Sequence, residues 1–279
     1  MLLVSLFFFT GCSEHETSLS DKARSEIDYF GAKFIDILNR LNNITFENYH
    51  VTAEQVELSR ETAENEKSSE SSSSQNNSDS PADVQGSNKN NTIISLQMSP
   101  NTILNPTTGE IDWAGIKNEV ENLYYSWNTV LIDLYELKVP NDDILGFSSS
   151  LDLATSYIKD ENKSNSILAM ANLYKFIPKY AEIISNEQAY INILKTKSFI
   201  LNAYSLVEAG DWKTVTIEID KALEVFKFVS SDVSFVSENS YRVNKVYVLL
   251  NELKNSLNLE DKDIFYIKYR NLMEEIVEL

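Results

Sequence analysis

Apolar residues in the second half of the chain recur at intervals of three and four residues, the spacing that places side chains on one face of an α-helix. The clearest run extends from Trp113 to Leu137 and ends before Pro140, because proline interrupts a helix interior. Its apolar positions are Trp113, Ile116, Val120, Leu123, Trp127, Val130, Leu134 and Leu137. The pattern predicts one long amphipathic helix with a single buried face.

The same spacing returns along the rest of the chain. It covers residues 27–41, 144–158, 167–184, 190–207, 212–229, 243–257 and 265–279. No stretch after residue 112 has a convincing strand pattern. Helices with one apolar face each and short connections pack as antiparallel neighbours. The sequence therefore predicts an all-α protein of about eight helices, arranged as an antiparallel bundle or as stacked helical hairpins.

Several local signals set the expected ends of these helices. Pro178 either bends its helix or divides it in two. The spacing in Ser185-Asn186-Glu187-Gln188 predicts a capping box at the start of the next helix. Gly210 is placed to close that helix, and Asp211 to cap the one after it. Asp261 is expected to cap the last helix.

The composition divides the chain into segments. Residues 21–58 hold an N-terminal helix and an irregular stretch, and its apolar face needs burial, so we expect this helix to dock on the main domain. Apolar residues nearly vanish in the serine-, asparagine- and glutamate-rich stretch 59–91, which predicts a disordered loop. An irregular connector, 92–111, leads to the helical domain, 112–279.

The first residues have the character of an export signal. Residues 1–11 carry no charged side chain and are mainly apolar, yet they are too few to span a bilayer. They end in Phe9-Thr10-Gly11-Cys12, which resembles the lipobox of bacterial lipoproteins, with phenylalanine where leucine is usual. This resemblance implies cleavage after residue 11, lipidation of Cys12, a tether over residues 12–20, and anchoring on the outer face of the bacterial cell membrane.

Charge and composition exclude several classes of protein. The chain has 24 Lys and Arg against 42 Asp and Glu, a net charge of −18, so nucleic acid is not an expected partner. With 7 glycines in 279 residues, phosphate-binding glycine loops are not expected. The single cysteine cannot form an intramolecular disulfide, so the fold has to be held by its hydrophobic core.

Residue sets for common catalytic chemistry are missing from the sequence. His15 and His50 are its two histidines, and both lie outside the clearly helical part. We therefore predict a non-enzymatic protein with no catalytic residues, cofactor or metal site. A hydrolase that uses two carboxylates stays open as an alternative. The carboxylates that fall off the apolar faces, and are expected in solvent, are Asp133, Glu136, Asp152, Glu182, Asp220, Glu224 and Glu252.

Aromatic residues offer two candidate binding features. Phe176 and Tyr180, beside Pro178, together with Trp212, are candidates for an aromatic groove, although packing in the core explains them too. Residues 197–229 show a weak similarity to the tetratricopeptide pattern, with no copy at the expected period. That resemblance rests on Ala203, Leu206, Gly210, Val215, Ile219 and Ala222. It implies a helical hairpin of a kind that binds peptides.

These observations predict a lipid-anchored, extracytoplasmic helical protein that binds or organises a partner, a protein or a small molecule, at the bacterial cell surface. The first alternative is a ligand-binding lipoprotein for a small molecule, peptide or cation. The second is the carboxylate-dependent envelope hydrolase. The sequence identifies neither the ligand nor the partner.

Overall fold

The computed structural model describes residues 18–44, 46, 103–104 and 109–279. The predicted signal peptide 1–11, Cys12, both histidines, the serine-rich segment 59–91 and most of the connector lie outside the described residues. The chain divides into a helical unit, which contains residues 18–42 and 110–279, and a second unit over 43–109. In the second unit, the Asn43 side-chain amide donates a hydrogen bond to the carbonyl oxygen of Gly109, at 2.9 Å.

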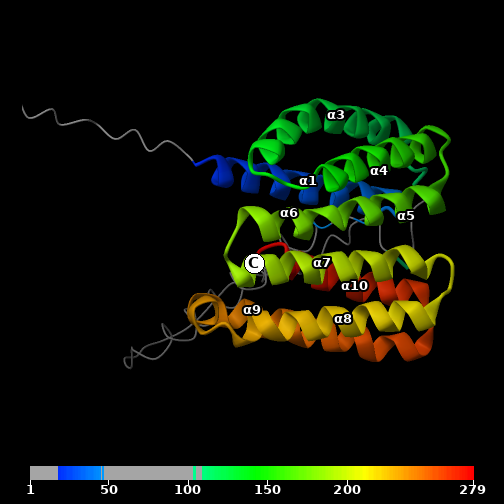
Figure 1. Cartoon of the computed structure of the whole chain (residues 1–279). Coiled ribbons are helices and arrows are strands. Elements are labelled where there is room, and N and C mark those ends of the chain that lie inside the picture. Colours follow the sequence, from blue (N-terminus) through cyan, green and yellow to red (C-terminus); the bar gives the residue numbers. More distant parts are fainter. Residues whose placement is uncertain (1–17, 45, 47–102, 105–108) are drawn as a thin grey trace, which may run out of the picture. The chain divides into compact units, whose positions relative to one another are not determined.

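The helical unit is all-α, as predicted (Figure 1). Its described helices are α1 (Leu19–Leu41), α3 (Trp113–Glu136), α4 (Asn141–Lys159), α5 (Lys163–Tyr174), α6 (Phe176–Ile184), α7 (Gln188–Val207), α8 (Trp212–Ser231), α9 (Val233–Ser256) and α10 (Lys262–Ile276), with a short 3₁₀ turn η1 (Leu257–Leu259). The predicted helix over 167–184 is two helices, α5 and α6, which meet at Lys175. Helix α9 begins about ten residues before the predicted start, with a kink at Asn239.

Acidic and polar side chains cap the starts of several helices. Asp211 accepts a hydrogen bond from the Thr214 amide at 3.1 Å, and Asp261 accepts one from the Ile264 amide at 3.0 Å, as predicted for both caps. Gly210 adopts a φ of 70°, which suits the residue after a helix end. The predicted capping box at Ser185 is wrong. Its hydroxyl accepts from the Glu187 amide, and α7 begins only at Gln188.

The helices of this unit stack as successive hairpins (Figure 1). Helices α3 and α4 pack against each other, α3 contacts α1, and α4 contacts α5. Helix α7 lies in the middle, with contacts to α5, α6, α8 and α10, while α9 packs on α8 and α10. The central position of α7 explains why apolar residues are buried on nearly all of its sides.

Helix α1 docks on the helical unit, as its apolar face predicted. Phe30 and Phe34 are buried among aromatic rings, including Trp127 of α3 at 6.0 Å and Phe147 of α4 at 5.8 Å from Phe30. At the other end of α1, the Tyr204 hydroxyl of α7 donates to the carbonyl oxygen of Leu38 at 3.0 Å. Burial of these large side chains and the hydrogen bond join α1 to two different layers.

One carboxylate that we expected in solvent is buried. Asp133 is 7% exposed, because α1 packs over that side of α3. Its Oδ2 atom lies 2.6 Å from the Lys22 ammonium of α1, and this ion pair offsets part of the cost of burial. The spacing of apolar residues on α3 predicts a single buried face, so it did not indicate that α1 also covers the side of α3 that carries Asp133.

Candidate functional site

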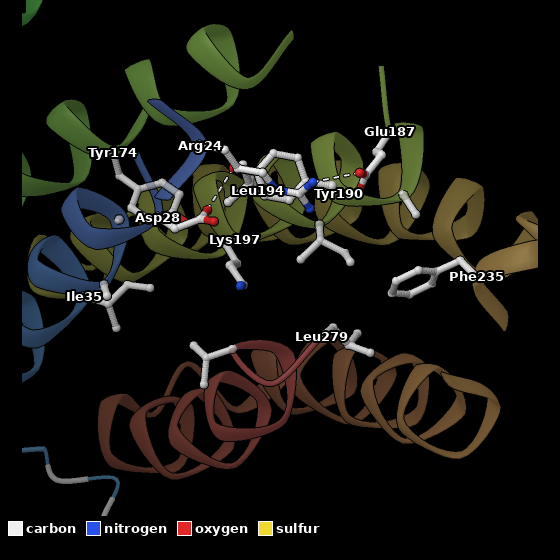
Figure 2. Close-up of a pocket in the computed structure, with 15 residues that line it drawn as sticks. Arg24, Asp28, Ile35, Tyr174, Glu187, Tyr190, Leu194, Lys197, Phe235 and Leu279 are labelled. Carbon is white, nitrogen blue, oxygen red and sulfur yellow. Dashed lines mark hydrogen bonds and ion pairs between the residues drawn. The ribbon is translucent and has the colours of Figure 1, made fainter. Parts of the chain in front are cut away.

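A cavity of about 420 Å³ lies between α1, α7, the start of α9 and the residues after α10 (Figure 2). This volume falls within the range of small-molecule pockets, about 300 to 1,000 Å³. Its walls are mostly apolar and come from distant parts of the sequence. The large apolar residues of the wall are Ile35, Ile193, Leu194, Phe235, Val277 and Leu279.

Small side chains leave room for this cavity. Ala32 of α1 and Ala189 of α7 both line it where larger residues would fill the space. Ala32 is exposed, so it borders the opening, whereas Ala189 is buried. The two alanines therefore mark positions where side-chain size controls access to the cavity.

Charged side chains at one edge of the cavity are paired with each other (Figure 2). The Arg24 guanidinium donates a hydrogen bond to Glu187 at 2.8 Å and lies over the ring of Tyr190, 4.0 Å from its centroid. The Tyr190 hydroxyl donates to the Asp28 carboxylate, also at 2.8 Å. The hydrogen bond from Arg24 lowers the pKa of Glu187, while burial raises the pKa of Asp28. Arg24, Glu187 and Asp28 thus each have a partner.

Lys197 also lines the cavity but differs from these three paired residues. Figure 2 shows its ammonium pointing from α7 into the cavity, with Ile35 on one side and Leu279 across from it. Among the described residues, no hydrogen bond or ion pair reaches this ammonium. Burial lowers the pKa of Lys197 to about 8, although the negative charges of Asp28 and Glu278 act in the opposite direction. At neutral pH Lys197 is therefore mostly protonated, and it adds a positive charge to the cavity that is in no ion pair or hydrogen bond with the described residues.

Tyr174 adds a polar atom to the same wall. Its ring is almost fully buried, at 1% exposure, and its hydroxyl has no hydrogen-bond partner within the described ranges. Burial raises the pKa of this hydroxyl, so it stays protonated and can donate. The cavity thus offers one ammonium and one hydroxyl to a ligand, set in an apolar wall.

None of the aromatic residues predicted for a groove lines this cavity. Phe176 and Tyr180 stand together, 6.1 Å between ring centroids, but in the aromatic cluster around Phe147. Tyr180 is buried and donates to the carbonyl oxygen of Asp143 at 3.1 Å. Trp212 packs elsewhere, against Phe265 of α10 at 6.4 Å. The structure therefore brings the first two residues together and separates the third from them.

Lys197 was not among the predicted site residues, although the sequence of α7 contains a signal for it. Helix α7 is apolar on nearly all of its sides, a pattern typical of a helix surrounded by others. Lys195 and Lys197 interrupt this pattern. Lys195 reaches Glu182 of α6 in an ion pair at 2.5 Å, which leaves Lys197 as the cation that required another explanation.

Two carboxylates line the cavity, Asp28 and Glu187, and each is hydrogen-bonded, to Tyr190 and to Arg24 respectively. A second pair of neighbouring carboxylates lies outside the cavity. Glu26 of α1 and Asp133 of α3 are neighbours, and burial and the charge of Asp133 raise the pKa of Glu26. Lys22 lies 3.7 Å from Glu26 and 2.6 Å from Asp133, so all three form an ion-pair cluster between two helices. Over the described residues, no group of three or more His, Cys, Asp or Glu side chains is placed to hold a metal ion.

A second buried ionisable group lies on α10. Glu274 is 0% exposed, and neither of its carboxylate oxygens has a hydrogen-bond partner among the residues described. Burial raises its pKa to about 8, while the charge of Arg270 acts in the opposite direction. The neighbouring Glu275 differs, because it forms an ion pair with Lys245 at 2.6 Å. Glu274 does not line the cavity.

Comparisons with protein-family models, with curated proteins and with solved structures gave no match for this chain. The lipobox and the tetratricopeptide resemblance therefore stay predictions from the sequence. None of the helices in the described ranges is both long and apolar enough to cross a membrane.

Proposed function

We propose that this chain is a lipid-anchored, non-enzymatic binding protein on the outer face of a bacterial membrane, and that the cavity between α1 and α7 takes a small, largely apolar ligand. The observation that carries this proposal is the cavity itself. About 420 Å³ of space is lined mainly by apolar side chains from α1, α5, α7, α9 and the residues after α10.

The lipid anchor is the second part of the proposal, and it rests on Phe9-Thr10-Gly11-Cys12. A fully extended chain covers about 3.5 Å per residue, so the six residues from Cys12 to Ser18 reach at most about 20 Å. Since Arg24 and Asp28 near the start of α1 line the cavity, an anchored Cys12 would hold the cavity close to the membrane surface. A ligand drawn from the membrane would have a short path.

Metabolic labelling with an alkyne fatty acid tests the anchor. We expect the full chain to be labelled in a bacterium that processes lipoproteins, and a Cys12→Ser variant to stay unlabelled. Equal labelling of both chains, or of neither, would contradict the proposed anchor.

The binding proposal is tested by filling the cavity entrance. A single-chain amphiphile such as decan-1-ol should raise the melting temperature of the full chain carrying Cys12→Ser, since a ligand that binds only the folded state stabilises it. Ala32→Trp should reduce or abolish this rise, because the indole occupies the opening. Ala114→Trp, also an exposed alanine on a helix but outside the cavity, is the matched control. A rise that Ala32→Trp leaves unchanged would place the binding elsewhere.

Binding of a protein partner is a second candidate function, favoured by exposed apolar side chains on α3. Tyr125, Ile132 and Tyr135 are 69%, 57% and 64% exposed and lie on one side of that helix. A photo-reactive amino acid at Tyr135 should then crosslink one defined protein in intact cells. The same residue placed at Lys159, at the end of α4, serves as the control position.

A further inference from the structure

The charges around the cavity differ in what they leave available to a ligand. Arg24 is bonded to Glu187, and Asp28 is bonded to Tyr190, so these groups already satisfy one another. Lys197 has no such partner in the part of the chain that the structure describes, and it faces the cavity. A buried ammonium without a partner is costly, and a bound anion would remove that cost.

The surroundings of Lys197 restrict the kind of anion. Ile35, Leu194 and Leu279 form apolar surface beside it, which favours an aliphatic body over a sugar or an inorganic ion. Tyr174 presents a hydroxyl without a partner on the same wall. The charge of Asp28 acts on this hydroxyl, so the ammonium of Lys197 is the group that matches a head with a single negative charge.

We infer that the ligand of this cavity is an aliphatic carboxylate, whose head group binds Lys197 and whose chain lies along the apolar wall. This inference rests on the proposed function, since it names the ligand class of the same cavity. Lys197 is the residue that selects the anionic head, and the apolar wall holds the chain whatever its head group.

The acidic character of the whole protein does not prevent such binding. The net charge of −18 repels anions at long range, but salt screens this repulsion beyond about 10 Å at 0.1 M. Among the described residues of the cavity, Lys197 is the charged group in no ion pair or hydrogen bond, and its field is screened less than that of a surface charge because apolar side chains surround it. The local charge therefore decides the sign of the ligand.

The test compares three probes with the same chain and different heads: decanoate, decan-1-ol and decylamine. Their affinities for the full chain carrying Cys12→Ser are measured by isothermal titration calorimetry at pH 7. We expect decanoate to bind about tenfold more tightly than decan-1-ol, the size of one charged hydrogen bond, and decylamine to bind most weakly. Lys197→Met should abolish the preference for decanoate and leave the affinity for decan-1-ol unchanged.

Two variants on the same helix serve as controls. Lys195→Gln also removes one positive charge from α7, but its ammonium is paired with Glu182 outside the cavity, so the preference for decanoate should persist. Lys197→Arg retains a cation and should keep part of the preference. The melting temperature of each unliganded variant verifies that it folds.

The outcomes separate this inference from the proposed function. Equal binding of decanoate and decan-1-ol, or tightest binding of decylamine, would overturn the anionic ligand and leave a cavity that binds apolar molecules. A preference for decanoate that survives Lys197→Met would overturn the role of that residue. If none of the three probes binds, the proposed function itself fails.

Discussion

Lys197 and Glu274 are both ionisable groups enclosed by helices, and burial brings the pKa of each to about 8 from opposite directions. Neither has an ion-pair partner within the described ranges. The surroundings differ, because Lys197 opens into a cavity of about 420 Å³, whereas Glu274 lies against packed helices with no exposed surface. One of the two groups can therefore meet a ligand, and the other cannot.

This difference shows how a perturbed pKa should be used to find a site. Burial alone shifts the pKa of any ionisable group, and a shift by itself does not distinguish a binding residue from a costly core residue. Access to a cavity supplies the distinction. Both groups destabilise the empty protein, but only for Lys197 can a ligand recover the lost free energy.

The largest expected effect concerns Glu274. Below about pH 4.5 the carboxyl is protonated in both folded and unfolded chains and costs nothing. As the pH rises, only the unfolded chain ionises, so the free energy of unfolding falls until the pH reaches about 8. From a pKa of about 8 against 4.5, Glu274→Gln should raise the free energy of unfolding at pH 7 by about 3 kcal/mol, as urea denaturation measures it.

The neighbouring residue gives the matched control for this prediction. Glu275 is also buried on α10 but is paired with Lys245. Glu275→Gln loses that ion pair and should lower the free energy of unfolding slightly, by up to about 1 kcal/mol. A Glu274→Gln variant that is less stable than the natural chain at pH 7 would show that this carboxylate has a stabilising partner.

A smaller effect is expected at Lys197. Above about pH 10.5 the amine is neutral in both states, and as the pH falls toward 8 only the unfolded chain gains a proton, so the stability of the folded protein decreases. Below pH 8 this cost is constant. Allowing for the partial exposure of the side chain, Lys197→Met should stabilise the empty protein by about 2 kcal/mol at pH 7.

The two variants should therefore separate with pH. The gain from Glu274→Gln grows between pH 4.5 and 8, whereas the gain from Lys197→Met shrinks between pH 8 and 10.5. Decanoate should separate the two variants as well. It should raise the melting temperature of Glu274→Gln as much as that of the natural chain. On Lys197→Met it should raise the melting temperature no more than decan-1-ol does. Parallel pH profiles of stability for the two variants would contradict the opposite pKa shifts of Glu274 and Lys197.

Most of the fold could be predicted from the spacing of apolar residues. Helices α3 and α8 follow their predicted stripes closely, because one buried face and a clear cap define each of them. The division at Lys175 and the early start of α9 could not be predicted. In the first case Pro178 allowed both a bend and a break, and in the second the residues before Val243 have no apolar stripe.

The site could not be predicted in the same way. Ile35 and Leu194 lie more than 150 residues apart, and Phe235 precedes the predicted part of its helix, so no local pattern brings them together. Lys197 could have been noticed as a cation within an apolar helix. The sequence does not show, however, that Asp28 bonds to Tyr190 and so forms no ion pair with Lys197. Local spacing predicts which residues are buried, and packing decides which of them enclose empty space.

The smallest expected effect concerns Tyr190. This variant tests whether the Tyr190 hydroxyl keeps Asp28 from pairing with Lys197. The Tyr190 hydroxyl holds the Asp28 carboxylate at 2.8 Å, and Tyr190→Phe removes this hydrogen bond while it keeps the ring beneath Arg24. Asp28 is then free to turn toward Lys197 and to compete with the ligand. Decanoate affinity at pH 7 should fall about threefold, roughly 0.6 kcal/mol, with little change for decan-1-ol. An increase in decanoate affinity would mean that Asp28 already repels the anion through Tyr190 rather than being held away from Lys197.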